Sequence, residues 1–279
     1  MAGESTYGTM STLFGNVYDL AILTAREYNG MLPLVTVKGD LSDSRPRIWA
    51  TYTGGTFDTL DENTDGTAQA FHASAAGTLT PAEYFQQVFL TDKRIRTDPM
   101  DAQREAGLHL GQTAAEHIDK TLVGLFSSFT GGTVGAGSAA LTFANVMLAS
   151  AKLRTNKAMG GYVCVVHPIQ WYRMTAATAD VPTLLQNNQT FMDSALRAFY
   201  QGSYSGIDFM VNANIAAGSA SVGGLFVQEA ITLDMRNPFH IEPERNASLR
   251  GWELNAGMEY GAGVIRPTFG IQLLGMGTI

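Results

Sequence analysis

The sequence predicts an α+β fold, in which one long helix packs on strands and a mixed α/β part follows it. Three observations predict this fold class. Strand-like alternation occurs in residues 45–90, apolar residues recur at every fourth position over 98–126, and alternation returns over 249–260. We therefore expect a strand-rich region on each side of the long helix along the chain.

The first forty residues predict a loose start, a short helix and an extended segment. Residues 1–8 are small and polar, which is typical of a loose terminus. Apolar residues from Leu13 to Leu23 are spaced as on one face of a short helix. Residues 31–37 are expected to be extended, because Pro33 excludes a helix interior.

Residues 45–90 predict a long hairpin. Large aliphatic side chains are few in this stretch, so it cannot bury enough apolar surface to form a core of its own. A projecting hairpin that packs on another chain explains this composition. Its strand-like stretches are residues 48–53, 67–73 and 84–89. Its turn signals are residues 54–55 and 63–66.

The long helix is predicted over residues 98–126. Asp98 is a suitable N-cap and Pro99 suits the first helical position. Each glycine inside the helix weakens it by about 1 kcal/mol, so packing on a sheet must compensate. A flexible link is expected over the glycine-rich residues 130–138. The apolar stripe consists of Ala106, Leu110, Ala114, Ile118, Leu122 and Phe126.

The rest of the chain predicts a mixed α/β part and then β-structure. Expected helices cover residues 141–153, 169–179 and 191–199, and a loop covers 201–206. Expected strands cover 162–166, 207–211, 224–227, 231–235, 249–260 and 264–274, with a break at 261–263.

The composition fits two interpretations about equally: a protein that associates with neighbours, and an ordinary soluble protein with a bland surface. Only 15% of the 279 residues are charged, against about a quarter in typical domains. The net charge of −7 and the absence of a basic run argue against tight, sequence-reading nucleic-acid binding. The single cysteine, Cys164, is expected to be a buried thiol in a reducing compartment. No membrane span or signal peptide is expected.

No catalytic, cofactor-binding or metal-binding residue is predicted. His109 and His117 lie eight positions apart, whereas two ligands of one metal on a helix need a spacing of four. His167 ends a strand. The serines of residues 202–206 are out of frame for a nucleophile elbow, and residues 131–137 lack the Gly-Lys-Ser/Thr ending of a phosphate loop. Asp61 and Glu62 are expected to be solvated turn residues.

The order of these elements resembles the major capsid proteins of tailed bacteriophages, which have the Hong Kong 97-type fold. Residues 162–172, Tyr-Val-Cys-Val-Val-His-Pro-Ile-Gln-Trp-Tyr, resemble the strand-then-helix step of these proteins. Residues 250–261, Arg-Gly-Trp-Glu-Leu-Asn-Ala-Gly-Met-Glu-Tyr-Gly, resemble the closing strands of their peripheral domain.

The resemblance implies four parts of the chain and a set of partners. Residues 1–40 would form an N-terminal arm, 41–92 the extended loop, 93–140 with 232–279 the peripheral domain, and 141–231 the axial domain. The chain would form hexamers and pentamers of a shell in the virion, assembled in the host cytoplasm, with non-specific contact to packaged DNA. A separate scaffolding protein, a portal and a decoration protein are the implied partners.

The extended loop carries the residues predicted to contact other subunits. Aromatic residues are enriched at the centres of interfaces, and those of this loop lack a local core. Crosslinking through a loop lysine, which some family members use, is not expected because residues 51–92 contain no lysine. The subunit-interface candidates are Trp49, Tyr52, Phe57, Leu60 and Phe71.

Three alternatives stay open at the level of sequence. An encapsulin-like nanocompartment shell would share the fold and differ in its contents. A soluble α/β enzyme predicts a small oligomer with a deep polar pocket. A tail or decoration subunit of a virion is disfavoured by the long helix, because such proteins are usually all-β.

Overall fold

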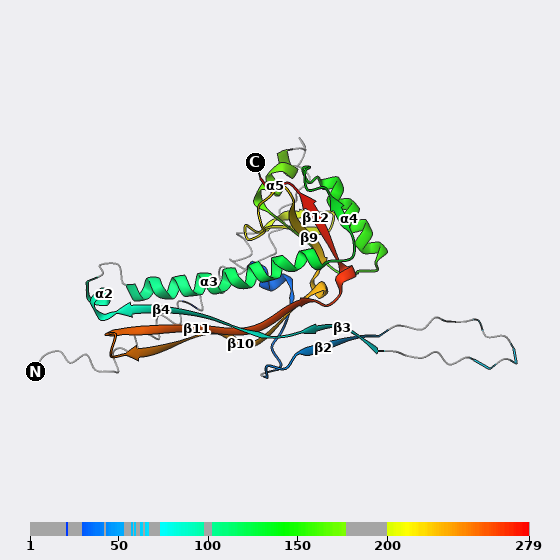
Figure 1. Ribbon diagram of the computed structural model, residues 1–279. Coiled ribbons are helices and arrows are strands. Elements are labelled where there is room, and N and C mark those ends of the chain that lie inside the picture. Colours follow the sequence, from blue (N-terminus) through cyan, green and yellow to red (C-terminus); the bar gives the residue numbers. More distant parts are fainter. Residues whose placement is uncertain are drawn as a thin grey trace, which may run out of the picture.

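The structure is a computed structural model, and it describes residues 21, 30–41, 43–52, 57, 59, 62–63, 65–66, 73–97, 102–176 and 200–278 (Figure 1). The predictions for residues 98–99, 177–179 and 191–199, and for residues 13–23 apart from Ala21, lie outside the described residues. The α+β class is confirmed, since the described elements are helices and three separate sheets.

A four-stranded sheet and a long helix form one part of the molecule. The helix α3 (Ala102–Gly124) lies along one face of this sheet (Figure 1). The strand β1 pairs with β10 in parallel, and the other pairs are antiparallel. The strands, in sheet order, are β1 (Thr36–Lys38), β10 (Ile231–Asn246), β11 (Gly251–Val264) and β4 (Ala82–Thr91).

The four-residue repeat of the sequence explains why α3 packs on this sheet. Its stripe from Ala106 to Leu122 is buried, and Phe126 follows in the short helix η2 (Leu125–Ser128) with no exposed surface. Gly111 has a packing role that the sequence did not indicate. A Cβ atom at this position would collide with the carbonyl oxygen of Ala21, so glycine allows that close approach.

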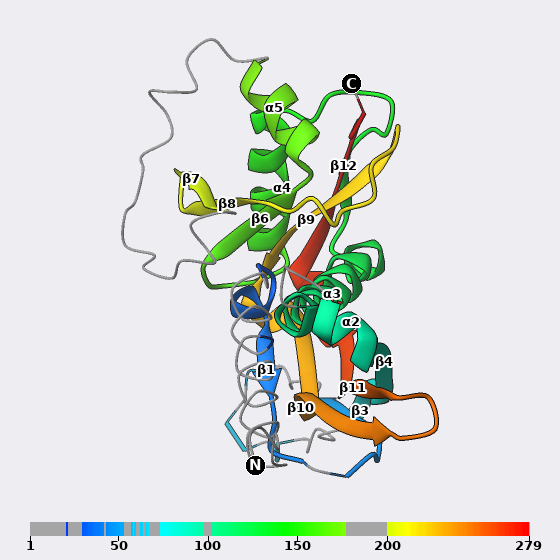
Figure 2. The ribbon, with the colours of Figure 1, turned by 90° about the vertical axis from the view of Figure 1, so that its left-hand side faces the viewer.

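A six-stranded sheet forms the other part of the molecule (Figure 2). The helices α4 (Phe143–Thr155) and α5 (Pro168–Ala176) share a core with Cys164 and Val166, whereas Val165 belongs to the core that contains Phe126. Alternate residues of a strand face opposite sides, so α4 and α5 cover one face of the six-stranded sheet and η2 covers the other. The strands, in sheet order, are β5 (Thr133–Gly135), β12 (Gly270–Gly275), β9 (Ser221–Val227), β6 (Tyr162–Val166), β8 (Ile207–Val211) and β7 (Tyr200–Tyr204).

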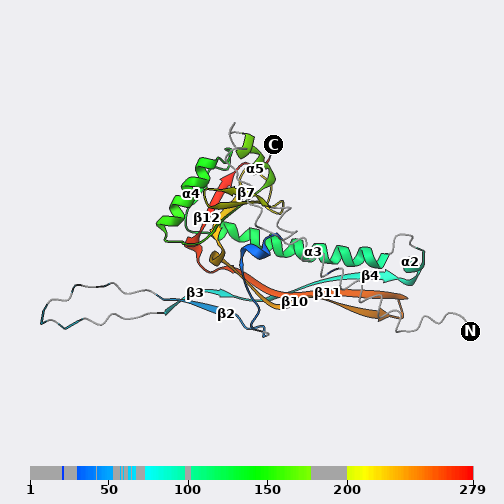
Figure 3. The ribbon, with the colours of Figure 1, turned by 180° about the vertical axis from the view of Figure 1, so that it is seen from behind.

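The predicted hairpin projects from one end of the molecule. Its strands β2 (Arg47–Tyr52) and β3 (Ala73–Leu79) form an antiparallel two-stranded sheet. The hairpin and the short helix α2 (Asp92–Thr97) lie at opposite ends (Figures 1 and 3). Short helices η1 (Leu32–Leu34), η3 (Gln228–Ala230) and η4 (Pro267–Phe269) connect other elements.

Three predictions for connecting segments were wrong. The expected extended segment at residues 31–37 begins with the helical turn η1, because proline suits the first turn of a helix. The expected flexible link contains β5, which pairs in parallel with β12. The expected loop at residues 201–206 is mostly β7, which pairs with β8. Partners that are distant in sequence supply the hydrogen bonds of β5.

The strands β10 and β11 are longer than predicted, whereas the strand predicted over residues 264–274 was wrong in its first half, because η4 precedes β12 there. The predicted break at residues 261–263 lies inside β11, and β10 continues past residue 235. A glycine at this break allows β11 to pass close to the hairpin strand β3, because a Cβ at Gly263 would collide with the side chain of Leu79. Irregular pairing between Met235 and His240 accommodates the polar and proline residues of β10.

Candidate assembly surface

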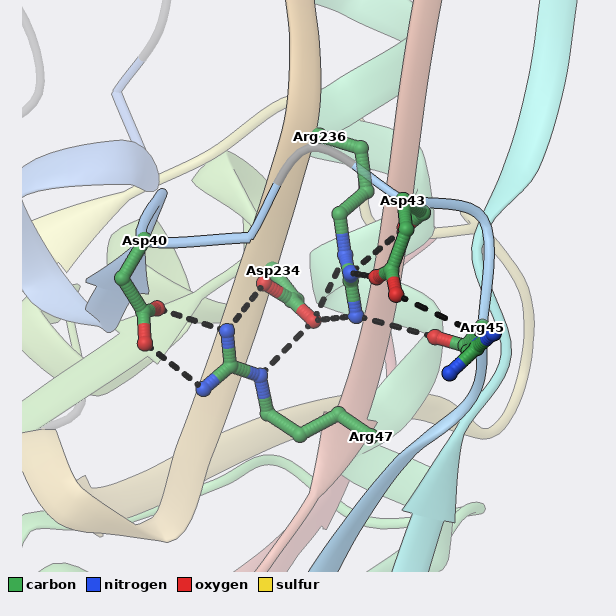
Figure 4. A network of polar contacts seen from close by, with 6 residues as sticks. All are labelled: Asp40, Asp43, Arg45, Arg47, Asp234 and Arg236. Carbon is green, nitrogen blue, oxygen red and sulfur yellow. Dashed lines mark hydrogen bonds and ion pairs between the residues drawn. The ribbon is translucent and has the colours of Figure 1, made fainter.

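The base of the hairpin is held by a buried cluster of charges (Figure 4). Asp234 and Arg236 lie two positions apart on β10, and their side chains are 1% and 0% exposed. Arg236 Nη2 donates to Asp234 Oδ2 at 2.7 Å, and Arg47 Nε of β2 donates to the same oxygen at 2.9 Å. Buried charges are tolerated when they are paired and hydrogen-bonded, which is the arrangement here.

The segment before the hairpin wraps around this cluster. Arg236 Nη1 donates to the backbone carbonyl of Asp43 at 2.6 Å and to its carboxylate at 2.8 Å, and Arg236 Nη2 donates to the carbonyl of Arg45 at 3.1 Å. Arg47 also donates to Asp40 at 2.6 Å. This hydrogen bond lowers the pKa of Asp40, and the two carboxylates raise the pKa of Arg47. The cluster therefore fixes the first hairpin strand to β10.

The structure places only some of the predicted interface residues. Trp49 is half-buried, and the guanidinium of Arg47 lies 5.8 Å from its ring centroid. Phe57 is fully exposed. The side chain of Tyr52 and all of Leu60 and Phe71 lie outside the described residues, so their contacts stay predictions.

Sequence reasoning missed one exposed apolar residue of the hairpin. Ile48 is 67% exposed, and it faces the side of β2 opposite to Trp49. Residues 48–53 were predicted as a strand-like stretch, but the exposure of Ile48 depends on how the described elements pack in the folded chain. Apolar side chains are therefore exposed on the hairpin in the isolated subunit, as at Ile48 and Phe57.

A cavity of about 250 Å³ lies between α3 and the four-stranded sheet. His117 Nδ1 and Tyr260 Oη are 2.8 Å apart, and Thr121 Oγ1 lies 3.0 Å from the same hydroxyl. Burial lowers the pKa of His117 and raises the pKa of Tyr260 to about 12. Both groups therefore stay neutral at pH 7, which fits a structural hydrogen bond. The lining residues are Tyr84, Phe85, Gln86, Leu110, Thr113, Ala114, His117, Phe239, Ala256, Gly257 and Met258.

The other titratable candidates have structural roles. His167 Nδ1 accepts the backbone N–H of Ile169 at 3.2 Å at the start of α5, and burial lowers its pKa. Cys164 has no exposed surface, and burial raises the pKa of its thiol, which opposes nucleophilic reactivity. Within the described residues, no three His, Cys, Asp or Glu side chains gather as metal ligands. None of the described helices is long and apolar enough to cross a membrane.

Asp119 joins α3 to two distant segments. Its carboxylate has no exposed surface, and it accepts hydrogen bonds from the backbone N–H of Met31 and from Asn212 Nδ2, each at 3.1 Å. Burial raises the pKa of Asp119 despite these hydrogen bonds, which act in the opposite direction. This buried carboxyl therefore connects the chain before β1 and the end of β8 to the long helix.

The raised pKa of Asp119 predicts an unusual pH dependence. Between the ordinary pKa of an aspartate and the raised value, the folded chain holds a proton that the unfolded chain has released. The contribution of Asp119 to stability should therefore increase as the pH falls through this window. We expect the free energy of unfolding of the wild-type subunit, minus that of Asp119→Asn, to rise on acidification in denaturant titrations. A difference that falls on acidification would contradict the assignment.

Comparison with solved structures identifies the fold. The chain matches the capsid asymmetric unit of cyanophage Pam1 with a TM-score of 0.68 and 10% identity, covering 90% of this chain and 92% of that chain. It matches Mycobacterium phage Che8 with a TM-score of 0.63 and 19% identity, covering 83% and 85%. A virus-like particle from Pyrococcus furiosus gives a TM-score of 0.62 and 7% identity, covering 93% and 98%. The fold is therefore the predicted Hong Kong 97-type fold.

The family follows from the sequence. The family model described as phage capsid protein matches residues 76–273, which is more than half of the chain. A search of curated protein sequences gave no match. The chain belongs to the phage capsid protein family, so the predicted resemblance is confirmed and its role is that of a structural shell subunit.

Proposed function

We propose that this chain is the major capsid protein that assembles by self-association into an icosahedral head shell around double-stranded DNA. The observation that best supports this proposal is the projecting hairpin. The buried cluster of Asp234 and Arg236 fixes its base, and Ile48 and Phe57 are exposed on it. Exposed apolar side chains on a projecting arm mark a surface that another chain can cover. Its role is structural and does not involve catalysis.

The domain division stays a prediction, and one pairing favours a change at its first boundary. The four parts are the arm at residues 1–40, the extended loop at 41–92, the peripheral domain at 93–140 with 232–279, and the axial domain at 141–231. The strand β4 pairs with β11 from Ala82 to Thr91. This pairing favours ending the extended loop near residue 80 and adding β4 to the peripheral domain.

The partners follow from the same proposal. Subunits form hexamers and pentamers, and a separate scaffolding protein, a portal and a decoration protein complete the head, which is assembled in the host cytoplasm. The net charge of −7 supports only loose, non-specific contact with packaged DNA. The fold similarity to the Pyrococcus furiosus particle keeps a nanocompartment shell as the second candidate. The contents of native particles, nucleic acid or protein cargo, distinguish the two.

A shortened hairpin tests the proposal. Tyr52 pairs directly with Ala73, so residues 53–72 can be replaced by Asn-Gly, which favours a two-residue turn between antiparallel strands. We expect this variant to fold with an unchanged unfolding transition but to form no shells, because the arm is lost. Light scattering after size-exclusion chromatography, with negative-stain microscopy, measures assembly with and without scaffold.

Two controls accompany this test. The wild-type chain must form shells, pentamers or hexamers, and a chain that stays monomeric with scaffold at high concentration would overturn the capsid function. A point variant, Phe57→Ser, keeps the hairpin length and removes one exposed aromatic side chain. Normal shells from the shortened variant would show that the hairpin does not carry the contacts between subunits.

A further inference from the structure

The face of the four-stranded sheet that points away from α3 is strongly acidic. Leu254, Ala256, Met258 and Tyr260 of β11 are buried on the helix side, so the residues between them point to the opposite side. The strand register places five glutamates there, and we call them the acidic face. They are Glu83 of β4, Glu242 and Glu244 of β10, and Glu253 and Glu259 of β11.

Two pairs of these glutamates lie directly opposite each other on neighbouring strands. Glu83 pairs with Glu259, and Glu244 pairs with Glu253. Like charges in this position destabilise a sheet. Within the described residues, no lysine or arginine forms an ion pair with the acidic face, and the ring nitrogen Nε2 of His240 lies 3.9 Å from the carboxylate of Glu242. The isolated subunit therefore carries a repulsion that a cationic partner would remove.

Two exposed aromatic residues extend the same face. Phe85 and Phe89 of β4 are 65% and 39% exposed, and the register places them opposite Gly257 and Glu253. The ring of Phe89 covers Gly251, where a Cβ atom would collide with it. A partner that combines cationic and aliphatic groups fits this face, because the stems of lysine and arginine cover apolar surface while their charges stay at the rim.

The chain itself carries exposed basic residues around α2, and α2 lies at the end of the molecule opposite to the hairpin (Figure 3). Five exposed basic residues, which we call the basic end, come from α2, the start of α3 and the β10–β11 turn. They are Lys93, Arg94, Arg96, Arg104 and Arg250. Their concentration contrasts with the net charge of −7 of the whole chain.

The basic end is held in a fixed shape. Arg245 of β10 donates to both oxygens of Asp92 at 2.9 and 2.8 Å, and it also donates to the carbonyl of Gly251 at 2.9 Å. The backbone N–H of Asp92 donates to the carbonyl of Arg250 at 2.9 Å. Bidentate contacts of this kind fix geometry as well as charge. The helix α2 is therefore presented rigidly beside the β10–β11 turn.

We propose that the acidic face of one subunit binds the basic end of a second copy. Within one chain, the basic end lies at the end of the sheet and cannot fold back over its flat outer face (Figures 1 and 3). Contacts between two different surfaces of identical chains form rings when the rotation closes, as a shell requires. The inference deepens the proposed function and depends on it, because it names a contact by which shell subunits associate.

The hairpin is a poorer partner for the acidic face. Residues 53–72 contain four acidic residues and no lysine or arginine. The hairpin therefore has the same sign of charge as the acidic face, and close contact would add to the repulsion. The acidic residues are Asp58, Asp61, Glu62 and Asp65.

Neutral substitutions give the first test. The double variant Glu83→Gln/Glu244→Gln removes one charge from each opposed pair. We expect the unfolding midpoint of the isolated subunit to rise, because repulsion is relieved, while the yield of shells at low salt falls at least about tenfold. Unchanged assembly together with higher stability would overturn the inference, because the charges would then have no partner.

Charge exchange gives the second test. Glu242→Lys/Glu244→Lys and Lys93→Glu/Arg96→Glu should each reduce shell formation, and a chain with all four changes should recover it. The control Arg154→Glu/Lys157→Glu makes the same change of charge on exposed residues at the end of α4, and we expect shells at the wild-type yield. If both double variants lose shell formation and the chain with all four changes does not recover it, the two surfaces contact different partners.

The salt dependence of assembly distinguishes a failure of the proposed contact from a failure of the proposed capsid function. Wild-type shell formation at low ionic strength should weaken when the salt concentration rises from about 0.05 to about 0.5 M, since exposed charges are screened. If the wild type forms shells and all charge variants match it, only this contact is wrong. If the wild type forms no particle under any condition, the capsid function itself is wrong.

Discussion

Asp234→Ala is expected to lower the free energy of unfolding of the isolated subunit by about 3–5 kcal/mol. Asp234 is the carboxylate between the guanidinium groups of Arg47 and Arg236, at 2.9 and 2.7 Å. Its removal leaves Arg236, whose side chain has no exposed surface, without its closest counterion. Chemical denaturation followed by circular dichroism measures the loss.

An exposed ion pair provides the control for Asp234. Glu229 and Arg266 form a pair at 2.8 Å with side chains that are 61% and 50% exposed, so Glu229→Ala should cost no more than about 1 kcal/mol. Equal losses in the two variants would show that water reaches the cluster. The variant Asp234→Ala should also reduce shell formation, because the base of the hairpin loses its attachment to β10.

Phe126→Ala is the second substitution with a large expected effect, about 3–5 kcal/mol of lost stability. Phe126 has no exposed surface, and its ring centroid lies 5.7 Å from that of Phe129 and 5.5 Å from that of Phe226. It packs against Gly224 of β9, where a Cβ atom would come within 2.9 Å of the ring. The core around it contains residues from both large sheets, so a cavity there loosens both parts of the molecule.

The matched control for Phe126 is an exposed aromatic residue. Tyr172 on α5 is 68% exposed, and Tyr172→Ala should change the free energy of unfolding by no more than about 0.5 kcal/mol. The same denaturation experiment compares the two variants. A loss below about 1 kcal/mol for Phe126→Ala would mean that the surrounding rings collapse into the space, and that the two sheets are held together elsewhere.

Local patterns were sufficient for elements whose burial repeats with a regular period. The four-residue stripe of α3 and the continuous apolar run of β6 were both located from spacing alone. The hairpin was also predicted, within residues 45–90, because alternation and turn signals are local properties. Its second strand is β3 at Ala73–Leu79, and the stretch predicted over 84–89 belongs to β4 of the four-stranded sheet. The family resemblance depended on the order of these same elements, which is why it could be recognised before any contact was known.

Contacts between residues far apart in the chain could not be predicted. Arg47 and Asp234 are separated by 187 positions, and Arg236 and Asp43 by 193, so no local spacing indicates the cluster at the base of the hairpin. The full length of β10 was missed because Pro238 and Pro243 argue against a strand. In the folded chain, pairing with β11 and the irregular register between Met235 and His240 allow the strand to continue through this segment. The basic end likewise comes from three segments that meet only in the folded chain.

Sequence periodicity and composition were enough for the α+β class and the projecting hairpin, because both follow from local burial patterns. The capsid family was recognised as a resemblance, from the order of the elements and from residues 162–172 and 250–261. The tertiary structure decided how the hairpin is attached, which of its apolar residues stay exposed, and where acidic and basic residues gather. Those properties depend on strand register and on long-range pairing, since register determines which face of a sheet each charge occupies.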